Sequence, residues 1–194
     1  RRGHSAAMII GVATRAHLAT IVGMRDEAST WLAERGIDQW RKPWPDHDAM
    51  ADRIAASIDA RETWMVHDDS EVVATVAIDR YADPSLWTPA ERAEPACYLH
   101  RLIVRRSHAG AGAVILDWAD HRAAQEQARW IRIDVWADNP GLQEYYRRHR
   151  FAYIRTSGPA DYPSGALFQR LVNQWAAAPA RLQTTERALP KLTW

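Results

Sequence analysis

Residues 105–119 read RRSHAGAGAVILDWA. Two arginines and a histidine lead into Gly110-Ala111-Gly112, and an apolar run follows at once. The preceding residues 97–104, CYLHRLIV, are typical of a strand, so the segment predicts a strand, a small-residue turn and a helix. The first amide groups of a helix lack partners within it and attract anions. The turn is therefore either a simple connection or a cradle for phosphate groups.

The sequence on both sides of this segment predicts a mixed α/β domain. Helix, strand and turn signals alternate in the order β-α-α-β-β-β-α-β-α-β-β, an antiparallel part followed by a βαβ crossover. The expected helices cover 14–35, 47–60, 112–129 and a segment from Asn139, and the expected strands cover 8–13, a hairpin within 62–79, 97–104, 130–137, 151–156 and 166–172. A proline-containing surface loop is expected over residues 80–96.

Composition limits the classes of protein to consider. The chain has 194 residues, 47% of them hydrophobic, which is enough for a sizeable core. A net charge of +1 gives no overall electrostatic reason to bind nucleic acid. No apolar stretch approaches the roughly 18 residues of a membrane span, so we expect neither nucleic acid nor membrane as a partner. The lone Cys97 favours a reducing, cytoplasmic setting.

The expected domain boundaries follow the changes in composition. We expect the domain to span residues 8–172 and residues 1–7 to be a leader outside the fold. Residues 173–194 are alanine-rich and broken by proline, so we expect a C-terminal arm. An exposed terminal strand or arm would permit a homodimer.

Residues 98–151 resemble the CoA-binding core of the GNAT superfamily of acetyl-CoA-dependent N-acetyltransferases. In that family a strand ends in a pyrophosphate loop, Q/R-x-x-G-x-G/A. A helix, a strand, an asparagine and a second helix follow, and that helix carries a tyrosine five residues before a phenylalanine. Residues 107–112 (SHAGAG), Asn139, Tyr146 and Phe151 look like these places.

Two places depart from the family pattern. Ser107 stands where glutamine or arginine is expected, and Arg150 replaces the glycine that usually precedes the phenylalanine. A second register of the loop, over residues 109–114, puts Val114 at the last glycine position and shortens the loop. None of these changes removes the backbone donors of the loop.

The resemblance implies an α/β fold, with a mixed sheet of six to seven strands and about four flanking helices. Its central parallel strands, 97–104 and 130–137, would splay apart. It implies acetyl-CoA as the co-substrate and a primary amine of a small molecule as the acceptor. We expect no metal, because the histidines show no ligand spacing with acidic residues.

Aminolysis of a thioester needs a neutral amine, a hydrogen-bond donor for the carbonyl oxygen and a proton for the leaving thiolate. By resemblance, the backbone of Leu102–Val104 pairs with the pantetheine arm, and an amide near Ile103 polarises the thioester. Tyr146 would protonate the thiolate. The other cofactor-binding residues that the resemblance implies are His108, Ala109, Gly110, Ala111, Gly112, Ala113 and Asn139. Asn139 is also expected to cap its helix.

The general base stays open between two residues. His100 has a suitable ordinary pKa and lies on the strand beside the expected reaction centre, and Asp134 lies on the neighbouring strand. A water chain, or an acceptor that arrives neutral, would need neither.

By resemblance to the family, the loop between the first two helices and the strand 161–172 wall the acceptor pocket, and aromatic side chains are expected there. Trp40 and Trp44 lie in a proline-rich loop between the first two helices, and Tyr98 is on the central strand. Aromatic rings at a pocket mouth favour an apolar or flat acceptor, and a cationic amine can lie on a ring face.

Alternative functions also fit the sequence. The chain could acetylate a protein or peptide N-terminus, or aminoacyl-tRNA. It could bind acyl-CoA without catalysis. In the simplest alternative it is an α/β interaction protein whose glycine loop is only a turn.

Overall fold

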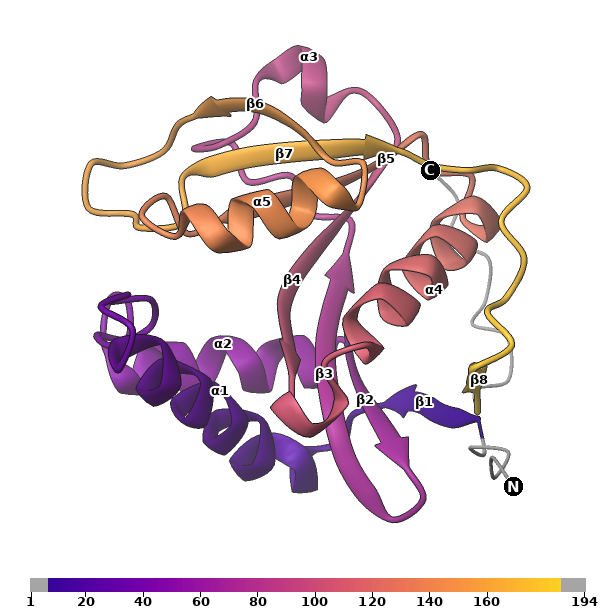
Figure 1. Cartoon of the computed structure of the whole chain (residues 1–194). Helices are drawn as coiled ribbons and strands as arrows, with labels where there is room; N and C mark the ends of the chain where they lie inside the picture. Colours follow the sequence, from indigo (N-terminus) through magenta and orange to yellow (C-terminus); the bar gives the residue numbers. More distant parts are fainter. Residues whose placement is uncertain (1–6, 186–194) are drawn as a thin grey trace.

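The computed structural model describes residues 7–185, which form one mixed sheet with helices on both faces (Figure 1). The strands are β1 (Met8–Val12), β2 (Thr63–Asp68), β3 (Glu71–Asp79), β4 (Ala96–Val104), β5 (Trp130–Val135), β6 (Ala152–Thr156), β7 (Ala166–Leu171) and β8 (Leu182–Thr184). The helices are α1 (Leu18–Ala33), α2 (His47–Asp59), α3 (Pro89–Arg92), α4 (Ala111–Gln125) and α5 (Pro140–Arg148). Within these residues the strand order is β6-β7-β5-β4-β3-β2-β1-β8.

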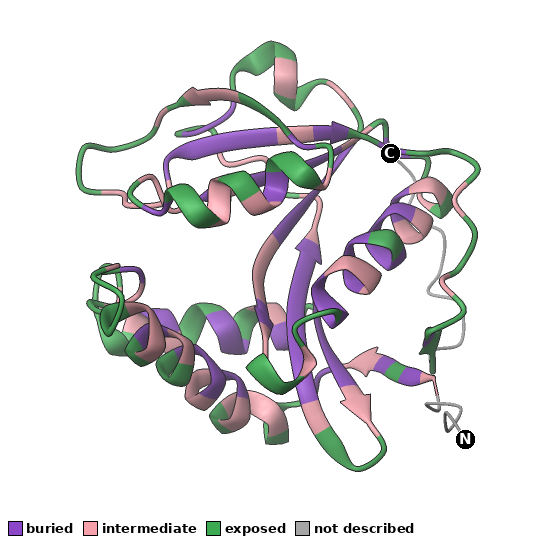
Figure 2. Cartoon of the chain, in the orientation of Figure 1, coloured by how far each residue is buried: buried purple, intermediate pink, exposed green. Residues whose placement is uncertain are grey.

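The two faces of the sheet bury different helices, and the alternation along β2 shows this directly. Trp64 and Val66 belong to the main core with α4 and α5, whereas Met65 between them packs against α1 and α2. Side chains alternate between the faces of a strand, so one strand supplies both cores. The central strands, the inward side of α4 and the sheet-facing residues of α1 and α2 are buried (Figure 2).

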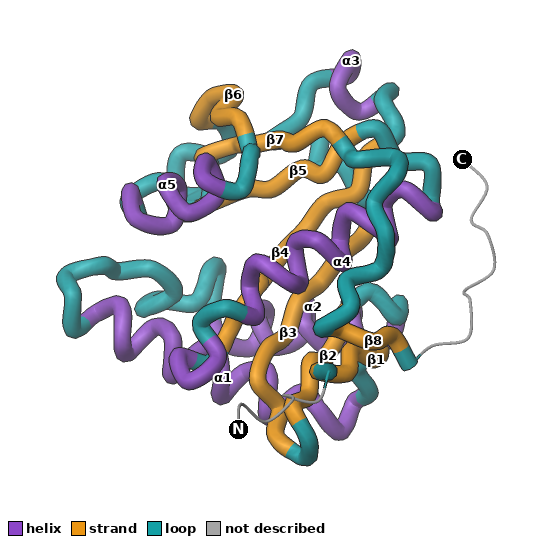
Figure 3. Tube along the Cα trace, turned by 45° about the vertical axis from the view of Figure 1, so that its right-hand side comes forward, coloured by secondary structure: helices purple, strands orange, loops and turns teal. Residues whose placement is uncertain are grey.

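The central parallel pair separates soon after it begins. β4 and β5 pair only at Ala96–Trp130, Cys97–Ile131 and Tyr98–Arg132. Beyond these pairs β4 continues along β3 and β5 continues along β7. The expected splay of residues 97–104 and 130–137 is therefore confirmed. In Figure 3, β5 lies at the top with β6, β7 and α5, whereas α1 and the loop after it lie at the lower left, and β4 runs between the two groups.

A bulge in β4 lies on the diverging part of the strand. Thr75 pairs with Ile103 and Ala77 with His100, so β4 has one more residue than β3 over this stretch. Arg101, within the bulge, has a φ of 48°. An extra residue bends and twists a strand, which turns β4 away from β5.

Several expectations about the elements need correction. The sheet has eight strands within the described residues, not six or seven, because the segment after Val172 adds β8, which runs parallel to β1. The expected loop 80–96 contains the single turn α3, which Thr88 and Glu91 cap reciprocally. The helix expected from Thr14 begins as a 3-10 turn, Arg15–His17, before α1.

The glycine missing before Phe151 also has a local explanation. Arg150 has a φ of 67°, in the left-handed region that favours glycine. Its backbone nitrogen donates to the Arg147 carbonyl, which closes the C-terminal turn of α5. An arginine therefore adopts here the conformation that glycine favours.

Within residues 7–185, no helix has both the length and the apolar character needed to cross a membrane.

Candidate active site

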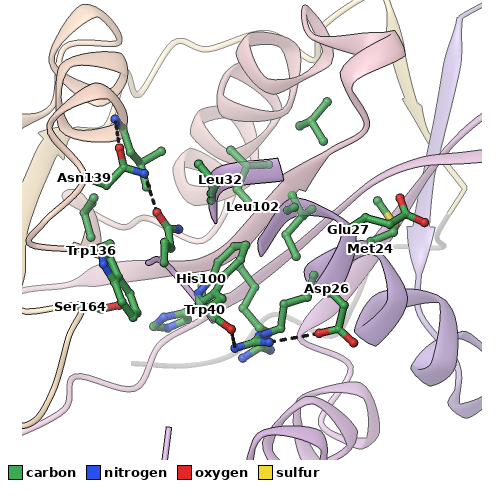
Figure 4. A pocket seen from close by; sticks show the side chains of 18 of the residues that line it. Met24, Asp26, Glu27, Leu32, Trp40, His100, Leu102, Trp136, Asn139 and Ser164 are labelled. Atoms are coloured by element: carbon green, nitrogen blue, oxygen red, sulfur yellow. Dashed lines mark hydrogen bonds and ion pairs between the residues drawn. The ribbon is translucent and has the colours of Figure 1, made fainter. Parts of the chain in front are cut away.

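A cleft of about 1470 Å³ opens where β4 and β5 diverge. It is lined by α1 and the loop after it, by β4 from Leu99 to Val104, by the end of β5, and by α5. In Figure 4, Trp136 and Ser164 stand at one wall and Met24 and Glu27 of α1 at the other, with Trp40 and His100 between them. A single drug-sized ligand fills about 300–1,000 Å³, so the cleft has room for a cofactor arm and an acceptor.

The glycine loop brings only part of its residues to this cleft. Ser107, Ala109 and Gly112 line it. A Cβ on Gly112 would lie 2.5 Å from the Tyr145 hydroxyl, whereas one on Gly110 would meet nothing within 4 Å. A side chain at position 112 would therefore have to displace the Tyr145 hydroxyl, whereas position 110 has room for one.

His108 faces a second, smaller cavity of about 320 Å³, which Gly110 and Ala111 also line. Its Nε2 lies 3.2 Å from Asp68 Oδ2, and its Nδ1 lies 2.9 Å from the Ser107 hydroxyl. The imidazole is thus engaged by protein groups. His108, Gly110, Ala111 and Ala113 are not among the residues that line the main cleft.

His100 lies between two carboxylates at the centre of the cleft. Its Nε2 is 3.1 Å from Asp79 Oδ2, and its Nδ1 is 3.4 Å from Asp134 Oδ1. Burial alone would lower the pKa of His100, but the hydrogen bonds and charges of Asp134 and Asp79 outweigh it and raise that pKa to about 10. The imidazole is therefore a cation at neutral pH, which leaves it no capacity to accept a proton.

Asp134 is held by partners on both sides. The Tyr162 hydroxyl donates to Asp134 Oδ2, opposite the contact with His100. Burial raises the pKa of Asp134, but the contacts with His100 and Tyr162 lower it by more, so the pKa falls below its ordinary value. Asp134 is a carboxylate that faces the cleft.

Tyr146 lies on the cleft-facing side of α5 and is 7% exposed. Its ring packs edge-on against Tyr145 and Phe151, at centroid distances of 5.4 Å each. Burial, helped by Tyr145 and Asp134, raises the pKa of Tyr146 well above its ordinary value. The phenol therefore stays protonated at neutral pH and can act as a proton donor.

Asn139 caps α5 as expected. Its Oδ1 accepts from the Leu142 amide at 3.0 Å, and its Nδ2 donates to Gln39 Oε1 at 2.6 Å. Both amide groups are buried, and together they join the loop after α1 to the start of α5 across the cleft. A contact of Asn139 with CoA stays a prediction, because the cap and Gln39 already engage its amide.

The loop of residues 39–46, called the tryptophan loop because it carries Trp40 and Trp44, is held by two arginines. The Arg25 guanidinium donates to the Trp40 carbonyl at 3.1 Å and lies 5.6 Å from the Trp40 ring centroid. Arg53 donates to the Trp44 carbonyl, and the Trp44 ring packs edge-on against Tyr162 at 5.3 Å. Both tryptophans line the cleft, and their role in binding the acceptor stays a prediction.

Tyr98 has a different place from the one expected. It is 3% exposed, packs against Trp87 at 5.6 Å, and its hydroxyl accepts from Arg132 at 3.1 Å. It is not among the residues that line the cleft. The splay begins after Tyr98, so its side chain lies where the two strands are still paired.

Comparison with known proteins places this geometry in a family. The sequence profile described as the acetyltransferase (GNAT) family matches residues 27–151. The chain belongs to this family. It is therefore an acyltransferase, and the mixed sheet with its splayed central pair is the fold that the resemblance implied.

Individual proteins similar to this chain are also N-acetyltransferases or have the fold of this family. An uncharacterized N-acetyltransferase of Bacillus subtilis (strain 168), YesJ, is 32% identical over 143 residues, 70% of this chain and 76% of YesJ. The crystal structure of a GNAT-family acetyltransferase from Listeria monocytogenes has a TM-score of 0.66 at 22% identity, covering 84% of this chain and 94% of that one. The PaiA N-acetyltransferase of Thermoplasma acidophilum, solved with coenzyme A, has a TM-score of 0.63 at 14% identity, covering 85% of this chain and 99% of that one.

Sequence reasoning missed three further residues in or beside this acetyltransferase's cleft: Gln39 and Tyr162 line it, and Asp79 contacts His100 from behind the lining. Asp79 ends β3, Tyr162 lies in the loop before β7, and Gln39 lies in the tryptophan loop. Asp79 and Tyr162 complete the array around His100 and Asp134, and Gln39 binds Asn139. Their spacing in the sequence carries no motif, because the fold alone brings them together. Within residues 7–185, no group of three or more His, Cys, Asp or Glu side chains could hold a metal ion.

Proposed function

We propose that this acetyltransferase transfers an acetyl group from acetyl-CoA to the primary amine of a small molecule. The amine attacks the thioester directly, with Tyr146 as the general acid. The PaiA relative is known with coenzyme A bound, and the proposal carries that ligand class to this chain.

The separation of β4 and β5 is the observation that carries the proposal. Beyond Tyr98, β4 has no strand partner on its β5 side among the described residues, so the backbone of Leu102–Val104 borders the cleft. An extended ligand can pair with such an edge as another strand would. In this proposal the amide groups at the start of α4, beside Ala109 and Gly112 of the cleft lining, bind the diphosphate, as a helix N-terminus favours an anion.

The charge states around His100 support one proposed set of proton transfers. His100 is a cation and holds Asp134 in place as a carboxylate. The acceptor must then reach the thioester as a neutral amine, and attack makes its nitrogen positively charged and acidic. Asp134 accepts that proton, the Ile103 amide stabilises the oxyanion, and Tyr146 donates a proton to the sulfur as the carbon–sulfur bond breaks.

Thiol release with a panel of amines tests the proposal. The chain should release CoA thiol from acetyl-CoA only when an acceptor amine is present. Tyr146→Phe should lower kcat roughly 100-fold or more, the usual size of a general-acid contribution. The adjacent Tyr145→Phe is the matched comparison, because it removes a neighbouring phenol from the same helix.

Three outcomes would contradict the proposal. Retention of CoA without thiol release would indicate a binding module. Acetylation of peptides but not of small amines would show that the acceptor is a peptide and not a small molecule. Equal losses in the Tyr145 and Tyr146 variants would remove the general-acid role from Tyr146.

A further inference from the structure

Arg101 occupies an unusual place beside the reaction centre. It lies in the β4 bulge, next to His100, with a φ of 48°. The left-handed region costs a residue other than glycine roughly 1–3 kcal/mol. Bulges near active sites redirect a side chain, and Arg101 is half-buried and lines the acceptor end of the cleft.

Arg101 also differs from the other arginines that line this cleft. Arg25 and Arg53 bind the carbonyls of the tryptophan loop, Arg105 pairs with Glu27 at 2.9 Å, and Arg106 stacks on Trp31. The Arg101 guanidinium makes neither a hydrogen bond nor a direct ion pair among the described residues, although Asp79, Asp134 and Glu62 act on its charge from farther away. Burial lowers its pKa, and the negative charges of Asp79 and Asp134 only partly offset this. A guanidinium withdrawn from water without an acceptor is costly unless a ligand supplies one.

The part of the cleft around His100 and Arg101, where the acceptor is proposed to bind, contains both negative and positive groups. Asp79 and Asp134 flank His100 and present negative charge, and Asp134 faces the cleft. Arg101 supplies positive charge beside them, and its other charged neighbours are Arg53 and Glu62. Such a pairing suits a ligand with a cationic or neutral amine at one end and an anion at the other.

Resting on the acetyltransferase function above, we propose that the acceptor is an amino-carboxylate whose carboxylate binds the guanidinium of Arg101. A guanidinium matches a planar carboxylate through two parallel hydrogen bonds. A phosphate, with its larger negative charge, would be repelled more strongly by Asp79 and Asp134. The apolar body of the acceptor would lie against Trp40, which stands beside His100 (Figure 4), and Trp44, which packs on the ring of Tyr162, whose hydroxyl binds Asp134.

Matched acceptors, with and without a carboxylate, test the proposal. Phenylalanine and tryptophan are compared with phenethylamine and tryptamine, and amino acids with longer amine-to-carboxylate spacing extend the series. The carboxylated acceptors should have the higher kcat/KM. Arg101→Gln should raise their KM roughly 10- to 100-fold, the usual effect of a charged hydrogen bond. It should leave the KM of the decarboxylated amines unchanged.

Two further variants separate binding from general damage. Arg101→Lys keeps the charge and should restore part of the preference for carboxylated acceptors. Arg92→Gln, exposed on α3 and outside the cleft, should leave both kinds of acceptor unaffected. Because the Arg101 guanidinium makes no hydrogen bond or direct ion pair within the described protein, Arg101→Gln should keep or raise the melting temperature.

The failures of the two proposals are distinguishable. An enzyme that acetylates amines with no preference for a carboxylate overturns the inference alone. Equal KM increases for both members of each pair, or a lower melting temperature in Arg101→Gln, would show a structural arginine and also overturn it. If no amine of either kind supports thiol release, the acetyltransferase function itself fails.

Discussion

His100 shows how strongly one residue's role depends on its neighbours. On the sequence alone, its ordinary pKa makes it a natural general base. In the structure, Asp79 and Asp134 lie on either side of the imidazole and raise its pKa to about 10. The side chain therefore supplies a positive charge beside Asp134, and the proposed mechanism gives the base role to Asp134 and not to His100.

The raised pKa of His100 predicts a specific pH dependence of stability. Between about 6.5, the ordinary value, and about 10, the folded protein binds more protons than the unfolded chain. The contribution of His100 to the free energy of unfolding is thus complete below about pH 6.5 and lost as the pH rises towards 10. Denaturant unfolding between pH 6 and 10.5 should show this decline in the wild type and a flatter profile in His100→Gln.

The control for this experiment is His47→Gln. His47 is exposed at the start of α2, 3.8 Å from Asp48, and should keep the wild-type profile. If wild type and His100→Gln decline in parallel, His100 is not a cation in the folded protein. Asp134 would then have to share the base role with His100.

At the scale of elements, the start of α5 and the tryptophan loop depend on each other. Asn139 caps α5 through Oδ1 and binds Gln39 through Nδ2, so one side chain fixes a helix end and a loop across the cleft. The cap is a local signal, because Asn-Pro often opens a helix. The bond to Gln39 is not local, since Gln39 belongs to the segment after α1.

Two substitutions at Asn139 should separate these contributions. Asn139→Ser keeps a capping oxygen but is too short to reach Gln39, and leaving the Gln39 amide buried and unpaired should cost about 1–3 kcal/mol. Asn139→Ala removes the cap as well and should cost roughly a further 1 kcal/mol. Denaturant unfolding measures both.

The position of the tryptophan loop gives a second way to measure the bond between Asn139 and Gln39. Trp40 follows Gln39 directly and lines the cleft, so both variants should raise the KM of the acceptor. A serine variant as stable as the wild type would show that the Gln39 bond contributes nothing. Equal stability of the serine and alanine variants would show the same for the cap.

At the scale of the whole molecule, the segment after Val172 adds to the fold but not to the cleft. β8 extends the sheet at β1, Leu182 is 1% exposed, and Trp118 Nε1 donates to the Thr184 hydroxyl at 3.1 Å. The residues that line the cleft all lie between Gly23 and Ser164. The proposed domain, residues 8–172, therefore contains the site but not the whole sheet.

Truncation tests this division. A chain that ends at Val172 should lose about 2–4 kcal/mol of stability, from the burial of Leu182 and the Trp118 hydrogen bond, while acetyl transfer continues. A chain that ends at Thr185 keeps β8 and serves as the control. Thermal unfolding and thiol release measure the two effects.

If the shorter chain fails to fold, the proposed domain boundary is wrong. Leu182→Ala then probes the same contact in the full chain and should cost about 2 kcal/mol or more. Loss of acetyl transfer in a folded short chain would place a functional group after Val172.

Much of the fold could be predicted because its signals are local. The order of strands and helices follows from apolar periodicity and from caps such as Asn139, and both act within a few residues. The same local signals placed Tyr146 on a helix, which is α5. Phe151 follows that helix, and its ring packs against Tyr146. The count of strands was too low because β8 has only three residues, too few for a periodic pattern.

The sequence by itself determined the βαβ core, the glycine turn before α4, the helix that carries Tyr146, and hence the family. Only the tertiary structure decided that β4 leaves β5 after Tyr98, that His100 is a cation between two carboxylates, and that Arg101 faces the cleft region without a hydrogen bond or direct ion pair among the described residues. The physical reason is the range of the interactions. Secondary structure arises between near neighbours in the chain, whereas charge state and burial depend on groups that only the folded sheet brings together.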